Sequence, residues 1–249
     1  MSDFLKFDKN FVVETKIKKD DIKFYNALNN PFKIYGVKHE NGIFRRMPEE
    51  VAKTVSEAVN RIHTQTAGGR IRFKTDSKYI AINAKMINIE RFSHFALTGS
   101  TGFDLYDGKR FIKSFVPPYD IKDGYESLIE FGSRKLREIT INFPLYSGVQ
   151  ELYIGLMEDA VLEEASPYKN KKPIVYYGSS ITQGGCASTP GMSYENIISR
   201  EFDYDYINLG FSGSAKAEDE MAEYISNLDM SLFVYDYDHH ITQNKNPEA

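Results

Sequence analysis

The hydrophobic periodicity of the chain changes once, and this change limits the fold more than any other feature. Upstream of about residue 158, apolar and polar residues alternate, as in RIRFKT, where Ile71 and Phe73 share one face. Side chains alternate across a strand, and turn residues separate the runs, so the pattern predicts an antiparallel β-sandwich over residues 1–165. One helix is expected to interrupt it, with Pro48 near its start. Glu49 and Glu50 in its first turn and His63 in its last turn suit the helix dipole.

After Pro173 the chain follows a different pattern. The apolar runs IVYY, YINLG and LFVYDYD are separated by two amphipathic segments, which gives the order βαβαβ. This order predicts the start of a parallel, doubly wound sheet covered by helices on both faces. The charged stretch EEASPYKNKKP before it is expected to be a linker. The fold class is therefore multi-domain, all-β then α/β, with a partial three-layer α/β/α domain at residues 173–249.

Charge and cysteine content exclude several classes of protein. The net charge is -4, whereas a nucleic-acid partner requires a basic surface. No apolar run approaches the roughly 18 residues of a membrane span, and the first residues lack the pattern of a signal peptide. The single cysteine, Cys186, cannot form an intramolecular disulfide. These features predict a cytoplasmic protein that binds neither nucleic acid nor membrane.

Three loops are expected at one edge of the parallel sheet, because ligands of such sheets bind beyond the carboxyl ends of the strands. The first loop carries Ser179 and Ser180, the second is GFSGS with Gly213, and the third is DYDHH with His239 and His240. A hydroxyl can attack a carbonyl, and backbone N–H groups of a glycine-rich loop can receive the oxyanion. The three loops together therefore favour acyl transfer.

These residues carry a resemblance to a known family. YYGSSITQGG and NLGFSGSA resemble the first two sequence blocks of the SGNH hydrolases, also called GDSL esterases. In that alignment Ser180 matches the nucleophile and Gly213 the oxyanion-hole glycine. Upstream, TAGGRIRFKTDS, TGFDLY and INFPLY resemble the GxDLY-type front domain of one subfamily. The resemblance implies a jelly-roll-like sandwich followed by a flavodoxin-like domain. It also implies hydrolysis of small-molecule esters or acylated carbohydrates, without a metal or an organic cofactor.

The sequence departs from the family pattern at three places. Ser179 stands where the family has aspartate, and His240 stands where it has the third-block asparagine, so His240 is assigned to the oxyanion hole. The DYDHH stretch is assigned to the third block, so by the resemblance the family's fifth block, the C-terminal Asp-x-x-His that supplies the general base, is expected to be missing. We expect a truncated hydrolase domain with impaired activity, and self-association through its incomplete sheet.

Several alternatives stay open at this stage. The chain could be a non-catalytic binding remnant of an esterase, or a gene fragment. Asp104 and Tyr106 of the GFDLY stretch could contact substrate, but a role at the domain interface is favoured. Cys186 is expected to be a buried small hydrophobe rather than a reactive thiol. Ser179 is expected to be a turn residue, His239 a loop residue and His63 a helix-end residue.

Overall fold

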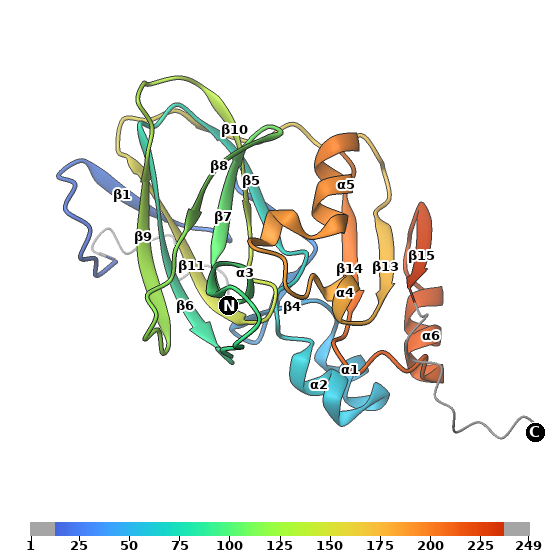
Figure 1. Cartoon of the computed structure of the whole chain (residues 1–249). Helices are drawn as coiled ribbons and strands as arrows, with labels where there is room; N and C mark the ends of the chain where they lie inside the picture. Colours follow the sequence, from blue (N-terminus) through green and yellow to red (C-terminus); the bar gives the residue numbers. More distant parts are fainter. Residues whose placement is uncertain (1–12, 237–249) are drawn as a thin grey trace, which may run out of the picture.

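A computed structural model describes residues 13–236, and its strands form two large antiparallel sheets and a smaller parallel one (Figure 1). The first antiparallel sheet has the order β1, β11, β6, β9, and the second has the order β12, β5, β10, β7, β8, with β2 beside β5. Their bounds are β1 Ile22–Asn26, β2 Lys33–Tyr35, β5 Arg70–Thr75, β6 Tyr79–Ile87, β7 Phe103–Asp107, β8 Arg110–Phe115, β9 Gly124–Glu130, β10 Arg137–Asn142, β11 Gly148–Met157 and β12 Leu162–Glu163. A hairpin of β3 (Lys38–Glu40) and β4 (Ile43–Arg45) lies beside them.

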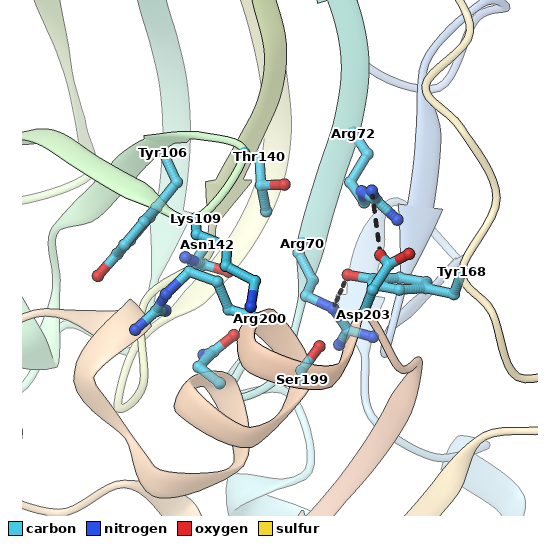
Figure 2. A pocket seen from close by; sticks show the side chains of 12 residues that line it. Arg70, Arg72, Tyr106, Lys109, Thr140, Asn142, Tyr168, Ser199, Arg200 and Asp203 are labelled. Atoms are coloured by element: carbon cyan, nitrogen blue, oxygen red, sulfur yellow. Dashed lines mark hydrogen bonds and ion pairs between the residues drawn. The ribbon is translucent and has the colours of Figure 1, made fainter.

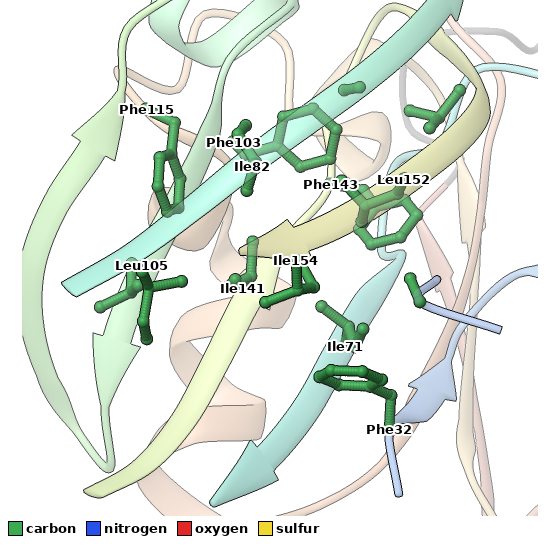
Figure 3. Close-up of a cluster of buried hydrophobic side chains, with 14 of the residues drawn as sticks. Phe32, Ile71, Ile82, Phe103, Leu105, Phe115, Ile141, Phe143, Leu152 and Ile154 are labelled. Carbon is green, nitrogen blue, oxygen red and sulfur yellow. The ribbon is translucent and has the colours of Figure 1, made fainter. Parts of the chain in front are cut away.

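The two antiparallel sheets enclose one hydrophobic core (Figure 3). Ile71 of the second sheet and Ile82 and Ile154 of the first are fully buried in it. The expected alternation is confirmed, since Ile71 and Phe73 both point into this core. Arg70 and Arg72 therefore project from the opposite face of β5, yet they are only 1% and 6% exposed. Another part of the chain must cover that outer face.

Tyr168 covers part of this face, and the main covering part is the segment after Pro173. Its central strand β13 (Ile174–Gly178) pairs in parallel with β14 (Tyr206–Gly210) and with β15 (Leu232–Asp236). The helices of this segment are α4 (Ser180–Gln183), α5 (Tyr194–Phe202) and α6 (Asp219–Ser226), with a 3-10 turn, η2, at Pro190–Met192. Figure 1 shows α5 between the parallel sheet and the outer face of the second antiparallel sheet. The two parts of the chain are thus packed side by side.

The single helix expected near residues 48–63 is two helices, α1 (Glu49–Val55) and α2 (Glu57–Ile62). Ser56 between them is extended, with φ -170°, and its hydroxyl accepts the backbone N–H of Val59. A serine side chain that caps a helix start competes with a continuous helix, which explains the break. Both helices belong to the hydrophobic cluster of the parallel sheet rather than to the sandwich core. A sequence segment assigned to the sandwich therefore packs against the other part of the chain.

Strand β15 lies at one edge of the parallel sheet and pairs with β13 among the described residues. Leu232, Phe233 and Tyr235 on this strand are 53%, 42% and 50% exposed. Large apolar side chains on an exposed strand edge are a common site of association between chains. Self-association through this edge stays a prediction.

The first turn of α5 contains a buried carboxyl group. Glu195 is fully buried, and this burial raises its pKa from the ordinary 4.5 to about 8. Desolvation disfavours the charged form of the carboxyl group. The native state therefore retains a proton between about pH 4.5 and pH 8 that the unfolded chain has released. The protein should lose stability as the pH rises through this window.

Replacing Glu195 with glutamine should remove this pH dependence. The unfolding free energy of Glu195→Gln is expected to exceed that of the parent by an amount that grows from pH 5 to pH 8, reaching on the order of a few kcal/mol. Urea unfolding at several pH values measures it. Glu220→Gln is the control, because Glu220 also lies in the first turn of a helix but is exposed. Equal pH profiles for Glu195→Gln and the parent would contradict the prediction.

Candidate active site

The candidate nucleophile lies where a buried strand turns into a short helix. Every residue of β13 is buried, and Ser180 follows it as the first residue of α4. Ser180 is half-buried, while Ser179, which precedes the helix, is only 6% exposed. Gly184 ends the helix in a left-handed conformation with φ +94°. This arrangement holds the Ser180 backbone firmly at the carboxyl edge of the sheet.

The loop after β14 lies directly against the Ser180 loop. The backbone N–H of Phe211 donates to the Gly178 carbonyl at 2.8 Å. A Cβ atom on Gly210 would lie 2.2 Å from the Gln183 nitrogen and 2.5 Å from the Thr182 carbonyl carbon. These neighbours are backbone atoms, so only glycine permits such a close approach. The sequence prediction that the first two loops meet at one edge agrees with these contacts.

Gln183 ties both loops to the sandwich. It is fully buried, and its Oε1 accepts the backbone N–H of Ser212 at 2.8 Å. Its Nε2 donates to the Gln65 Oε1 at 2.5 Å and to the Leu145 carbonyl at 3.1 Å. A buried amide with satisfied donors and acceptor fixes its neighbours, because breaking any of these bonds leaves a polar group unpaired.

The end of the third strand is connected to the same helix. The Thr182 hydroxyl donates to Asp236 Oδ2 at 2.9 Å, and Asn208 Nδ2 donates to the Thr182 carbonyl at 2.6 Å. Helix α4 thus contacts the carboxyl ends of β14 and β15. His239 and His240 follow β15 and lie outside the described residues.

A hollow of about 440 Å³ opens in front of Ser180. The parallel part contributes Ser180, Ile181, Gly185, Cys186 and Ser212 to its lining, and the sandwich contributes Phe92, His94, Phe95 and Tyr146. The Tyr146 hydroxyl lies 3.3 Å from the Ser180 carbonyl oxygen and donates to it. The sequence interpretation assigned no site role to these sandwich residues, which lie in irregular segments, although Tyr146 ends the INFPLY motif. Aromatic residues beside a turn were the one sequence signal for the others.

Arg46 is a buried residue that contacts the loop after β14. It is 4% exposed and donates to the carbonyl oxygens of Gly210 and Ile62, and its guanidinium group lies 4.5 Å from the centroid of the Phe211 ring. Burial lowers its pKa to about 9, so the side chain stays charged at pH 7. A buried cation beneath a carbonyl adds positive potential close to the loops of the site.

Gly213, which was assigned to the oxyanion hole, and Cys186, which was expected to be buried, lie differently from Ser180. Gly213 is exposed with φ +66°, and a Cβ atom there would meet no atom within 4 Å. Its neighbour Ser212 lines the hollow, whereas Gly213 is not among the lining residues that the structure describes. The expectation for Cys186 is wrong, because its side chain is exposed. Cys186 has φ +64° after two glycines, and this tight turn directs it outward.

Asp104 and Tyr106 of the GFDLY stretch connect the two parts of the chain. Asp104 is fully buried, and its two oxygens accept Asn142 Nδ2 at 2.8 Å and the Gly191 N–H at 2.7 Å. Burial raises the pKa of its carboxyl group. The ring of Tyr106 packs against Gly191 and lies 4.3 Å from the guanidinium carbon of Arg200. These contacts support the favoured interface role.

His63 ends α2, as expected. It is 2% exposed, with Nε2 at 2.7 Å from Arg45 Nη1 and Nδ1 at 2.6 Å from the Asn60 carbonyl. Burial lowers its pKa, which suits a neutral ring that accepts from Arg45. No group of three or more potential metal ligands is found in residues 13–236. None of the helices in the same range is long and apolar enough to cross a membrane.

Two family models match the sequence, one for each part of the chain. Residues 22–162 match the family model GxDLY, described as the N-terminus of SGNH-hydrolase-type esterases, and residues 171–245 match the GDSL-like Lipase/Acylhydrolase family. No protein in the curated set matches the sequence.

Three solved structures show the similarity in three dimensions. A protein described as a GDSL-like lipase from Bacteroides ovatus has a TM-score of 0.79 and 28% identity over 88% of this chain and 65% of its own length. The salicylyl-acyltransferase SsfX3 of a tetracycline biosynthetic pathway has a TM-score of 0.67 and 18% identity over 87% and 62%. A family two carbohydrate esterase from Cellvibrio japonicus has a TM-score of 0.51 and 10% identity over 77% and 53%.

The last two structures are too distant in sequence to show more than a shared fold. The chain spans less than two thirds of the length of each of the three proteins. The GxDLY match, in contrast, covers more than half of the chain and includes the residues that join its two parts. The chain therefore belongs to the GxDLY-containing SGNH hydrolase family, whose second part is a GDSL-like lipase/acylhydrolase segment.

Proposed function

We propose that the protein is a serine esterase that uses Ser180 as its nucleophile. The observation that carries this proposal is the position of Ser180 at the start of α4, between two tightly tied loops and facing a hollow. Attack of the Ser180 hydroxyl on an acyl carbonyl would form a tetrahedral intermediate, then an acyl-enzyme that water cleaves. The hydroxyl proton passes to a general base and from there to the leaving alcohol.

The oxyanion of this intermediate needs donors beside Ser180. We assign the backbone N–H groups of Ser180 and Gly213, and the side chain of His240, to this role. The Gly213 assignment is supported by the adjacent Ser212, which lines the hollow. His240 would supply a ring N–H in place of the family's asparagine amide.

The chain is proposed to consist of two domains, at residues 1–165 and 173–249. The first would be a jelly-roll-like sandwich and the second part of a three-layer α/β/α domain. The tight contacts of Asp104 and Gln183 across the boundary support a site shared by both domains. The aromatic rings of Phe92, Phe95 and Tyr146 would then contact the substrate from the sandwich side.

The proposed substrates are small esters, including acylated carbohydrates. The hollow of about 440 Å³ accommodates a short acyl group with part of its alcohol. Aromatic rings offer apolar surfaces for sugar faces or acyl chains. The carbohydrate esterase from Cellvibrio japonicus shares only the fold, so the choice between the two substrate types depends on comparing turnover of an aryl acetate and an acetylated sugar.

Residues 1–249 by themselves are expected to hydrolyse esters poorly. Across residues 13–236, no histidine nitrogen makes a hydrogen bond to the Ser180 hydroxyl. His94 lines the same hollow but is exposed, with its ring 5.8 Å from that of Phe92. A serine hydroxyl without a base is a weak nucleophile at neutral pH.

A fluorophosphonate probe tests this expectation directly. The 249-residue chain should be labelled slowly or not at all, and a version extended by an Asp-x-x-His segment should be labelled at Ser180. Mass spectrometry of the labelled peptide identifies the site. Rapid labelling of Ser180 in the 249-residue chain would show that a base is already present, and His94→Ala would then test whether His94 is that base.

A further inference from the structure

A second cavity, of about 200 Å³, lies between the sandwich and α5, and it shares no lining residue with the hollow at Ser180. We propose that this cavity binds the phosphate group of a small molecule. Its walls come from the outer face of β5 and β10, the turn between β7 and β8, and α5 (Figure 2). The inference does not depend on the proposed esterase activity.

The lining of this cavity is strongly basic. It contains Arg70, Arg72, Lys109 and Arg200 but only one carboxylate, Asp203. Arg70 is already satisfied, because it contacts Asp205 and donates to the Tyr168 hydroxyl at 2.9 Å. Lys109 lies 3.0 Å from Glu201. The cations that remain least compensated are Arg72 and Arg200.

Arg72 is the central observation. It is 6% exposed, and its Nε and Nη1 atoms are buried without any hydrogen-bond partner. These two atoms carry three N–H bonds. Its Nη2 lies 3.4 Å from Glu138 Oε1 and 3.6 Å from Asp203 Oδ1, which are long contacts for ion pairs. Buried charged donors normally have acceptors, so unpaired N–H bonds beside a cavity point to a bound acceptor.

Arg200 reaches the cavity from the opposite wall. Its Nη1 donates to the Gly191 carbonyl at 2.8 Å, and Tyr106 lies against its guanidinium group. Both contacts hold the side chain in place, as the ring of Tyr168 does for Arg72 at 4.1 Å. Figure 2 shows Arg72 and Arg200 extending from different walls, with Thr140 between Tyr106 and Arg72 in this view. Fixed cations are preorganised for an anion, which reduces the entropic cost of binding.

The arrangement suits a tetrahedral dianion better than a planar carboxylate. Donors from β5, β10 and α5 approach from different directions, and the oxygens of a phosphate also point in different directions. Two loosely compensated guanidinium groups match the charge of about -2 that a phosphate monoester carries near neutral pH. Asp203, which directly follows α5, carries a charge that opposes an anion, but its carboxylate is itself paired with Arg72 at 3.6 Å. Sulfate has the same shape and charge, so it serves as a second probe.

Thermal unfolding in inorganic phosphate, at constant ionic strength, tests the proposal. Phosphate up to about 50 mM should raise the Tm in a saturable manner, and sulfate should do the same, whereas acetate should not. Isothermal titration calorimetry then gives the Kd. Arg72→Met is expected to weaken phosphate binding by about tenfold or more. Lys85→Met is the control, because it removes one cation from an exposed ion pair with Glu151 on another sheet.

A second variant, Thr140→Val, keeps the proposal testable if Arg72→Met does not fold. Thr140→Val removes a hydroxyl from the cavity wall without changing charge, and it should weaken phosphate binding by several-fold. Equal stabilisation by acetate would overturn the tetrahedral dianion. Absence of stabilisation by phosphate, or stabilisation that Thr140→Val and Arg72→Met leave unchanged, would overturn the site.

Discussion

Replacing Ser180 with alanine is expected to lower the kcat of ester hydrolysis by about 10⁴-fold or more. The physical reason is that no other group at this position can form the acyl-enzyme, so only the residual acceleration from oxyanion and substrate binding, about 10³–10⁴-fold over water, would remain. The measurement uses p-nitrophenyl acetate and a version of the protein extended by an Asp-x-x-His segment. Circular dichroism checks that the variant is folded.

Ser179→Ala is the matched control for this experiment. Ser179 is the neighbouring hydroxyl, but it is buried and its side chain makes no hydrogen bond to the start of α4. Its loss should change kcat by less than about threefold. If Ser179→Ala abolished turnover and Ser180→Ala did not, Ser179 rather than Ser180 would be the nucleophile. If neither variant lost activity, the assignment of Ser180 as the nucleophile would fail.

Replacing Asp205 with asparagine is expected to destabilise the protein by about 3 kcal/mol, because it leaves the Arg70 guanidinium without its counterion. The Arg70 side chain is 1% exposed, and that of Asp205 is 25% exposed. The carbonyl of Tyr206 at 3.3 Å and the Tyr168 hydroxyl remain as acceptors, so the loss falls at the lower end of the range for buried pairs. For a protein of this size the Tm should fall by about 6–12 °C.

Asp229→Asn tests whether the loss of stability expected for Asp205→Asn depends on burial of the ion pair. Asp229 also pairs with a cation, Lys172 at 2.6 Å, but the two side chains are 76% and 54% exposed. Water screens such a pair, so the same substitution there should change stability by less than about 0.5 kcal/mol. Equal, small effects of both substitutions in urea unfolding would show that the Arg70–Asp205 pair contributes nothing to the contact between the two parts of the chain.

Local features of the candidate site could be predicted from the sequence. The strand, the turn with Ser180 and the glycine-rich loop are consecutive in the chain, and their backbone conformations depend on near neighbours. The aromatic wall of the hollow could not be predicted. Phe92 and Tyr146 lie 88 and 34 positions before Ser180 in the printed sequence, in irregular segments, and only packing of the two parts brings them together.

The break at Ser56 shows a different limit. The residues at the two ends of the segment 48–63 indicated one helix, and the helical content is indeed there. The pattern did not indicate that Ser56 would cap a second helix, because serine is tolerated within helices as well as at their starts. It also did not indicate which sheet the helices would cover. Val55 and Val59 pack with Val175 and Leu209 of the parallel sheet, far along the chain.

The sequence by itself determined the two periodicities, the strands at RIRFKT, IVYY, YINLG and LFVYDYD, and the local form of the Ser180 turn. Each of these depends on alternation or on residues a few positions apart. Only the tertiary structure determined that the polar face of β5 is buried. Arg70 and Arg72 alternate with Ile71 and Phe73, as solvent-facing residues of a sandwich do, yet both are buried against the α5 side of the molecule. An alternating pattern states which face of a strand is apolar, but what covers the polar face depends on contacts with distant parts of the chain.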